Sequence, residues 1–132
     1  METFLRPWSA QLLSILRIVT GILLFEHGTA KHLWFPAGPM NNASVNTMSG
    51  AAGVLELIGG ALLVFGLFTR PVAFILSGMA AVAYFYVHFQ RGFFPILNGG
   101  ELAALYCFVL LYIAAAGGGA WSADTIGRKT KD

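Results

Sequence analysis

Ionisable residues inside apolar segments are the most chemically suggestive feature of this sequence. The run from residue 12 to residue 31 is long enough to cross a bilayer, yet it holds Arg17, Glu26, His27 and Lys31. Because an ionised group inside a membrane is costly unless it is paired or hydrated, such residues are candidates for a functional site. The complete set of candidates is Arg17, His27, Lys31, Glu56, His88, Arg91 and Glu101.

The two histidines suggest what chemistry this set could perform. His27 and His88 can change protonation state near neutral pH, and carboxylates beside them would suit the movement of protons. We expect the candidates to share a polar pocket in the outer leaflet, with flat walls supplied by Tyr84, Phe85 and Phe108. The hypothesis is a site for a small anion or for the head group of a quinone.

Other kinds of active site lack their signatures. No His-x-x-His, Glu-x-x-His or cysteine pair provides the spacing of a metal site, so we expect no metal. The one cysteine, Cys107, lies in an apolar run without an evident base, and no residue can be named as catalytic. No motif for a bound flavin, haem or iron–sulfur cluster is present, so no cofactor is indicated by an evident motif.

The elements that must position these residues are membrane helices. The chain is 57% hydrophobic and 11% charged, whereas soluble domains are about 25% charged. A bilayer core needs ~20 apolar residues per helix. The segments of suitable length are residues 9–30, 49–68, 71–88 and 99–116. We therefore expect an all-α membrane protein, a four-helix transmembrane bundle in which residues 1–132 form a single domain.

Basic residues outside the helices predict the orientation. Arg6, Arg70 and the basic tail at residues 128–131 would lie on one side, and Lys31 and Arg91 on the other. By the positive-inside rule both termini then face the cytoplasm, and we expect a multi-pass protein of the bacterial inner membrane. The net charge of +2 is concentrated at the chain ends and indicates no nucleic-acid surface.

Helical phase predicts which candidates face inward. At about 100° per residue, Arg17, Gly28 and Lys31 share one stripe of the first helix, and the glycine would allow another helix to approach closely. Glu26 points away from this stripe. The inward stripes of the other helices are Gly53, Glu56, Gly60 and Val64, then Ser77, Ala81, Tyr84 and His88, and finally Glu101, Ala104, Phe108 and Tyr112. We expect Arg17 to pair with Glu56 between the first two helices.

Three runs of sequence form a distinctive combination. Residues 12–36 hold an early arginine and a His-Gly-x-x-Lys motif near the end of a helix, and residues 53–73 hold a glycine-rich helix that ends in a tight turn. Residues 92–124 include Asn98-Gly99-Gly100-Glu101 and the closing Gly119-Ala120-Trp121-Ser122. Together these runs resemble the DoxX family of small bacterial membrane proteins. The resemblance implies a four-helix membrane bundle.

The resemblance also implies a range of functions. Some relatives are similar to the small subunit of a thiosulfate:quinone oxidoreductase, and others take part in membrane complexes that handle oxidative stress. We therefore expect the membrane subunit of a quinone-linked oxidoreductase complex, at most a part of an enzyme. A non-catalytic anchor or assembly factor and a small transporter are the alternatives. The expected partners are the lipid bilayer and either another protein or further copies of this chain.

Overall fold

The computed structural model describes residues 2–41 and 43–130, and every regular element in that part of the chain is a helix. The elements are α1 (Glu2–Leu5), η1 (Arg6–Trp8), α2 (Ser9–His32), α3 (Met48–Phe65), α4 (Thr69–Ala83), η2 (Tyr84–His88), η3 (Phe89–Arg91), α5 (Pro95–Asn98), α6 (Glu101–Ala116) and α7 (Ala123–Lys129). The four predicted segments correspond to α2, to α3, to α4 with η2, and to α6.

Three continuous helical stretches are long and apolar enough to cross a membrane. They are Arg6–His32, Met48–Phe65 and Thr69–Arg91. The remaining apolar helix, α6, is shorter, with 16 residues. The all-helical, apolar architecture predicted from the sequence is thus confirmed for the described part of the chain.

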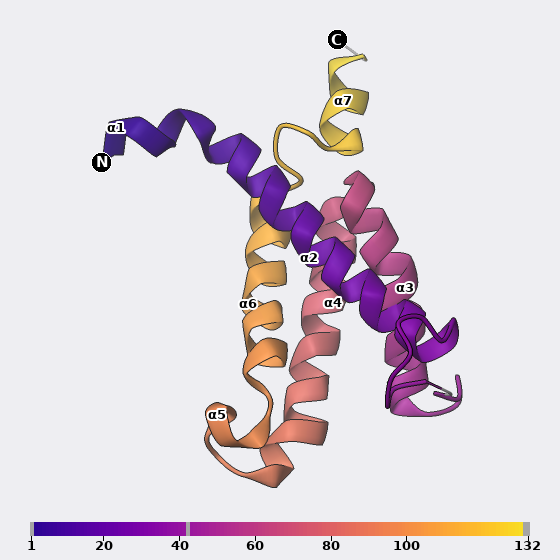
Figure 1. Cartoon of the computed structure of the whole chain (residues 1–132). Helices are drawn as coiled ribbons and strands as arrows, with labels where there is room; N and C mark the ends of the chain where they lie inside the picture. The colour runs from indigo at the N-terminus through magenta and orange to yellow at the C-terminus, as the bar shows by residue number, and fades with distance from the viewer. Residues whose placement is uncertain (1, 42, 131–132) are drawn as a thin grey trace.

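Two helical hairpins build the molecule. α2 packs along α3 and α4 packs along α6, whereas the contact between α3 and α4 is much smaller. A short turn joins α3 to α4, and Figure 1 shows the two helices diverging from it. We call the end that carries this turn and α7 the terminal end, and the end that carries α5 and the α2–α3 connection the loop end (Figure 1). The two hairpins therefore form a V that is open at the loop end.

Glycines allow α2 and α3 to lie almost backbone to backbone. A Cβ atom at Gly28 would lie 2.5 Å from the backbone nitrogen of Leu57, and one at Gly60 would lie 2.6 Å from that of Phe25. No side chain fits at such distances, so the crossing requires glycine. The inward stripe predicted for α2 is confirmed, since its members are all buried: Arg17, Gly21, Leu24, Gly28 and Lys31.

The apolar core lies mainly between α4 and α6. Its buried members are Leu24, Leu63, Ala73, Leu76, Ala80, Tyr106, Leu110 and Ile113. The inward stripe predicted for α6 is wrong, because Glu101, Phe108 and Tyr112 are exposed. α6 is apolar on all sides, so its hydrophobic pattern has no phase to detect. Glu101, on which the prediction depended, lies in the first turn, where the helix dipole favours an exposed carboxylate.

The segment after α6 closes the terminal end. The Asp124 carboxylate accepts hydrogen bonds from the backbone N–H groups of Phe68 (2.9 Å) and Thr69 (2.8 Å) at the start of α4. Burial alone would raise the pKa of Asp124, but the backbone hydrogen bonds and the charge of Arg128 outweigh it, so the pKa lies below its ordinary value. The ionised carboxylate fixes the turn at the apex of the V.

At the loop end the chain leaves α4 through a π-helical turn, η2. Such turns are rare and occur frequently at functional sites. The loop that follows is organised by Asn98, whose side chain donates to the Gly92 carbonyl (3.0 Å) and accepts from the Gly100 N–H (2.8 Å). The loop is therefore held against η2 rather than left free above it.

Candidate functional site

A cavity of about 620 Å³ lies between the two hairpins at the loop end. Most of its lining is apolar, including Leu24, Leu55, Ile75, Met79, Ala80 and Val82. The ionisable side chains that line it are His27, Lys31, Glu56, His88 and Tyr106. Apolar walls with a few convergent polar groups are typical of a site for a small organic ligand.

The shortest polar contact in the cavity wall is an ion pair between Lys31 and Glu56. Lys31 Nζ lies 2.8 Å from Glu56 Oε2, and each side chain is only 9% exposed. Among the side chains of residues 4–41 and 43–130 it is the one ion pair. The close packing of Gly28 on α3 brings Lys31, less than one turn further along α2, beside Glu56. Since a buried pair gains little net stability, its presence in a cavity suggests a role toward a ligand.

The predicted pair between Arg17 and Glu56 is therefore wrong. Arg17 lies eleven residues before Gly28, roughly 16 Å along the helix, and so it lies at the terminal end. Its guanidinium donates instead to backbone carbonyls, those of Val64 (2.7 Å), Gly118 (2.8 Å), Trp121 (2.8 Å) and Leu63. Two of these belong to the last turn of α3, where the helix dipole is negative and stabilises a cation.

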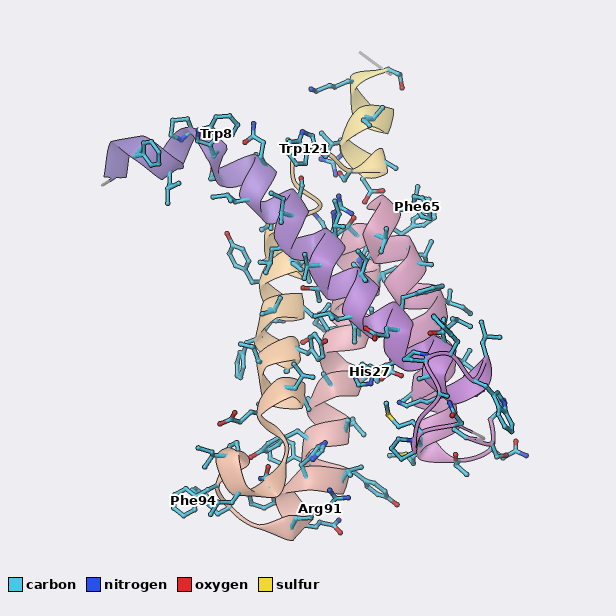
Figure 2. All side chains as sticks on the ribbon, viewed as in Figure 1. Trp8, His27, Phe65, Arg91, Phe94 and Trp121 are labelled. Atoms are coloured by element: carbon cyan, nitrogen blue, oxygen red, sulfur yellow. The ribbon has the colours of Figure 1, made fainter. Side chains whose placement is uncertain are left out.

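Two histidines reach the cavity from different hairpins. His27 extends from α2, and Figure 2 shows it on the side toward α4. His88 is the last residue of η2, and its Nδ1 lies 3.3 Å from the carbonyl oxygen of Asn98. Tyr106 adds a hydroxyl from α6. Hydrogen-bonding groups thus approach the cavity from both sides of the V.

The other predicted site residues lie outside this cavity. Arg91 and Glu101 are exposed at the loop end, where Figure 2 labels Arg91. Phe108 is 70% exposed, and Phe85 is exposed beside Tyr84, with ring centroids 5.3 Å apart. The walls expected to be aromatic are mainly aliphatic instead.

Two residues, Tyr106 in the cavity wall and Asn98 beside His88, were not identified from the sequence. Tyr106 carries a hydroxyl in the middle of an apolar segment, which is a signal in the sequence. The inward face predicted for α6 was wrong, however, and it placed Tyr106 on the outward face. Asn98 stood in the Asn98-Gly99-Gly100-Glu101 run, where its side-chain contacts leave no periodic signal. Its part in holding the loop becomes visible only in three dimensions.

Apolar residues of α3 and α4 line one side of the cavity. Three of them, Leu55 on α3 and Ile75 and Val82 on α4, are exposed by 42%, 55% and 53%.

Comparison with known proteins assigns the family. The sequence pattern that defines the DoxX family matches residues 12–89, which is more than half of the chain. The chain belongs to the DoxX family. The match covers α2, α3, α4 and η2, and so includes most of the ionisable cavity residues: His27, Lys31, Glu56 and His88. Together with the long apolar helices, family membership identifies a multi-pass membrane protein.

Individual relatives extend the comparison over most of the chain. An uncharacterized protein of Haemophilus influenzae is 46% identical over 125 residues, which cover 91% of this chain and 93% of that protein. A Bacillus subtilis protein named "Putative oxidoreductase CatD" is 30% identical over 106 residues, 78% of this chain and 77% of that protein. No solved structure matches.

Proposed function

We propose that this DoxX-family protein is the membrane subunit of a quinone-linked oxidoreductase complex, and that the cavity is its quinone site. The observation that carries the proposal is the cavity of about 620 Å³, with aliphatic walls and ionisable groups on both hairpins. A quinone head group is a flat apolar ring with two carbonyl oxygens, so it requires apolar walls and hydrogen-bond donors. The printed name of the Bacillus subtilis relative agrees with this class of activity.

The proposed role of each polar group follows from its chemistry. Lys31 and Tyr106 donate hydrogen bonds to ring oxygens, and Glu56 orients the Lys31 ammonium. His27, which also lines the cavity, forms a hydrogen bond with the bound ring. The chain has no motif for a flavin, haem or iron–sulfur cluster, so we propose that electrons pass between the ring and a partner protein.

An opening of the cavity between α3 and α4 is part of this proposal. Quinones carry long isoprenoid tails and are dissolved in the bilayer. A ring that enters between α3 and α4 can leave its tail among the lipids, because the residues that flank the opening, Leu55, Ile75 and Val82, are apolar and exposed. A water-soluble anion would gain nothing from this route.

Binding of short-tailed ubiquinone and menaquinone to the protein in nanodiscs tests the proposal. We expect His27→Ala and Tyr106→Phe each to weaken binding about three- to tenfold, because each removes one hydrogen bond in an apolar site. Tyr112→Phe and Glu101→Gln are matched controls that remove similar groups from exposed positions, and they should bind like the parent. Absence of binding by the parent, or equal affinity in all four variants, would refute the quinone site.

We also propose that all four apolar helices cross the bacterial inner membrane and that both termini are cytoplasmic. The cations Arg6, Arg70 and Arg128 support this orientation by the positive-inside rule. Reporter fusions after residues 40, 69, 95 and 128 should then alternate outside, inside, outside, inside. A fusion after residue 69 that reports the outer side would reverse the assignment.

One observation favours an anchoring function as the second candidate. Large aromatic residues are exposed in the two connections at the loop end: Trp34, Phe35, Phe93 and Phe94. They could hold a partner protein at the membrane surface. If Trp34→Ala and Phe94→Ala abolish capture of a partner while the parent shows no quinone binding, the anchoring function replaces the proposed one.

A further inference from the structure

His88 is held in one tautomer by a backbone carbonyl. Its Nδ1 lies 3.3 Å from the carbonyl oxygen of Asn98. A carbonyl oxygen can only accept a hydrogen bond, so Nδ1 must carry the hydrogen. In the neutral ring the other nitrogen, Nε2, then holds a lone pair and acts as an acceptor. Among the residues that the structure describes, Nε2 has no hydrogen-bond partner, and His88 lines the cavity.

The Asn98 side chain determines where that carbonyl lies. Asn98 is 2% exposed, and its amide is used on both sides: Nδ2 donates to the Gly92 carbonyl, and Oδ1 accepts from the Gly100 N–H. Nδ2 also lies 3.4 Å from the Tyr84 hydroxyl, which ties the loop to η2. These contacts leave the backbone carbonyl of Asn98 free to face the imidazole of His88.

We propose that Asn98 is a positioning residue that keeps Nε2 of His88 as a hydrogen-bond acceptor, so that the cavity binds the hydroquinone form of its ligand in preference to the quinone form. The selection between redox forms rests on the proposed quinone site. The tautomer of His88 does not, because it follows from contacts within the chain.

A hydroquinone satisfies both sides of the cavity. Its hydroxyl group donates to Nε2 of His88, and the oxygen at the opposite end of the ring accepts from the Lys31 ammonium on the other hairpin. A quinone carbonyl beside Nε2 would place two acceptors against each other with no hydrogen between them. One buried acceptor would then lose its partner, which lowers affinity about five- to tenfold.

Nitrogen NMR of the protein in nanodiscs, without ligand, tests the tautomer. We expect the ring of His88 to carry its hydrogen on Nδ1 and not on Nε2, and His88→Gln assigns the signal among the three histidines. A ring that carries a hydrogen on Nε2 would overturn the inference. Because no quinone is present, this result is independent of the proposed function.

Titration with the two redox forms of one short-tailed ubiquinone tests the selection. The parent should bind the reduced form about five- to tenfold more tightly, and Asn98→Ala should remove both that preference and the Nδ1–H tautomer. Asn46→Ala changes an exposed asparagine in the other loop and should keep both. Should Asn98→Ala fail to fold, Asn98→Asp, which keeps the acceptor for the Gly100 N–H, takes its place.

The outcomes separate the two proposals. A parent that binds neither form refutes the quinone site and leaves the tautomer to the NMR result. Equal binding of both forms with the Nδ1–H tautomer present overturns the redox selection. A variant at Asn98 that retains both tautomer and preference overturns the positioning role.

Discussion

An Arg17→Leu variant is expected to lose about 3–5 kcal/mol of unfolding free energy, because several buried carbonyls lose their donor at once. Arg17 is fully buried, and its guanidinium connects α2 to the last turn of α3 and to the segment after α6. The losses do not simply add, since the Leu63 carbonyl also accepts from the Gly66 N–H. The measurement is reversible unfolding in mixed detergent micelles, followed by circular dichroism.

Two further variants show whether geometry or charge carries this effect. Arg17→Lys keeps the charge, but a single ammonium cannot reach all the carbonyls that lie around the planar guanidinium. We therefore expect a loss of unfolding free energy smaller than that of Arg17→Leu. Arg91→Leu removes an exposed arginine and should change stability by less than about 0.5 kcal/mol. An Arg17→Leu protein within 1 kcal/mol of the parent would show that water replaces the guanidinium.

The helices could be predicted from the sequence because their length and apolar composition depend on local residues alone. The packing face of α2 could also be predicted, since Arg17, Gly28 and Lys31 mark one stripe in an otherwise apolar helix. The face of α6 could not. Its one charged residue, Glu101, lies at the exposed start of the helix and marks its end rather than its inner side.

The candidate site was predictable in part, for side chains whose depth follows from their position along a helix. His27 and His88 reach one cavity, as their positions along their helices suggested. The partners of Arg17 and of His88 are backbone carbonyls, and every residue of a chain carries one. No pattern of residue types can indicate which carbonyl will be placed beside a side chain, because that depends on how the helices pack.

A Lys31→Met variant is expected to lose about 3–5 kcal/mol of stability, because it leaves the Glu56 carboxylate without its partner in an apolar wall. The Nζ–Oε2 distance of 2.8 Å and the 9% exposure of both side chains make this a buried pair rather than a surface contact. Adding Glu56→Gln should recover much of the loss, since a neutral amide is cheaper to bury than an unpaired charge. In a double-mutant cycle the coupling energy should be at least about 3 kcal/mol, whereas additive effects would argue against contact.

The same double variant separates a structural role of the pair from a role in ligand binding. Replacing both partners of a buried ion pair is often neutral for stability, so stability alone gives no reason for Lys31 and Glu56 to be present. Their position in the cavity wall supplies one, because only a charged Lys31 can donate a strong hydrogen bond to a ring oxygen. We therefore expect the protein with Lys31→Met and Glu56→Gln to fold with near-parental stability and to bind short-tailed ubiquinol at least tenfold more weakly. Near-parental binding by a stable double variant would show that the pair serves only to hold α2 against α3.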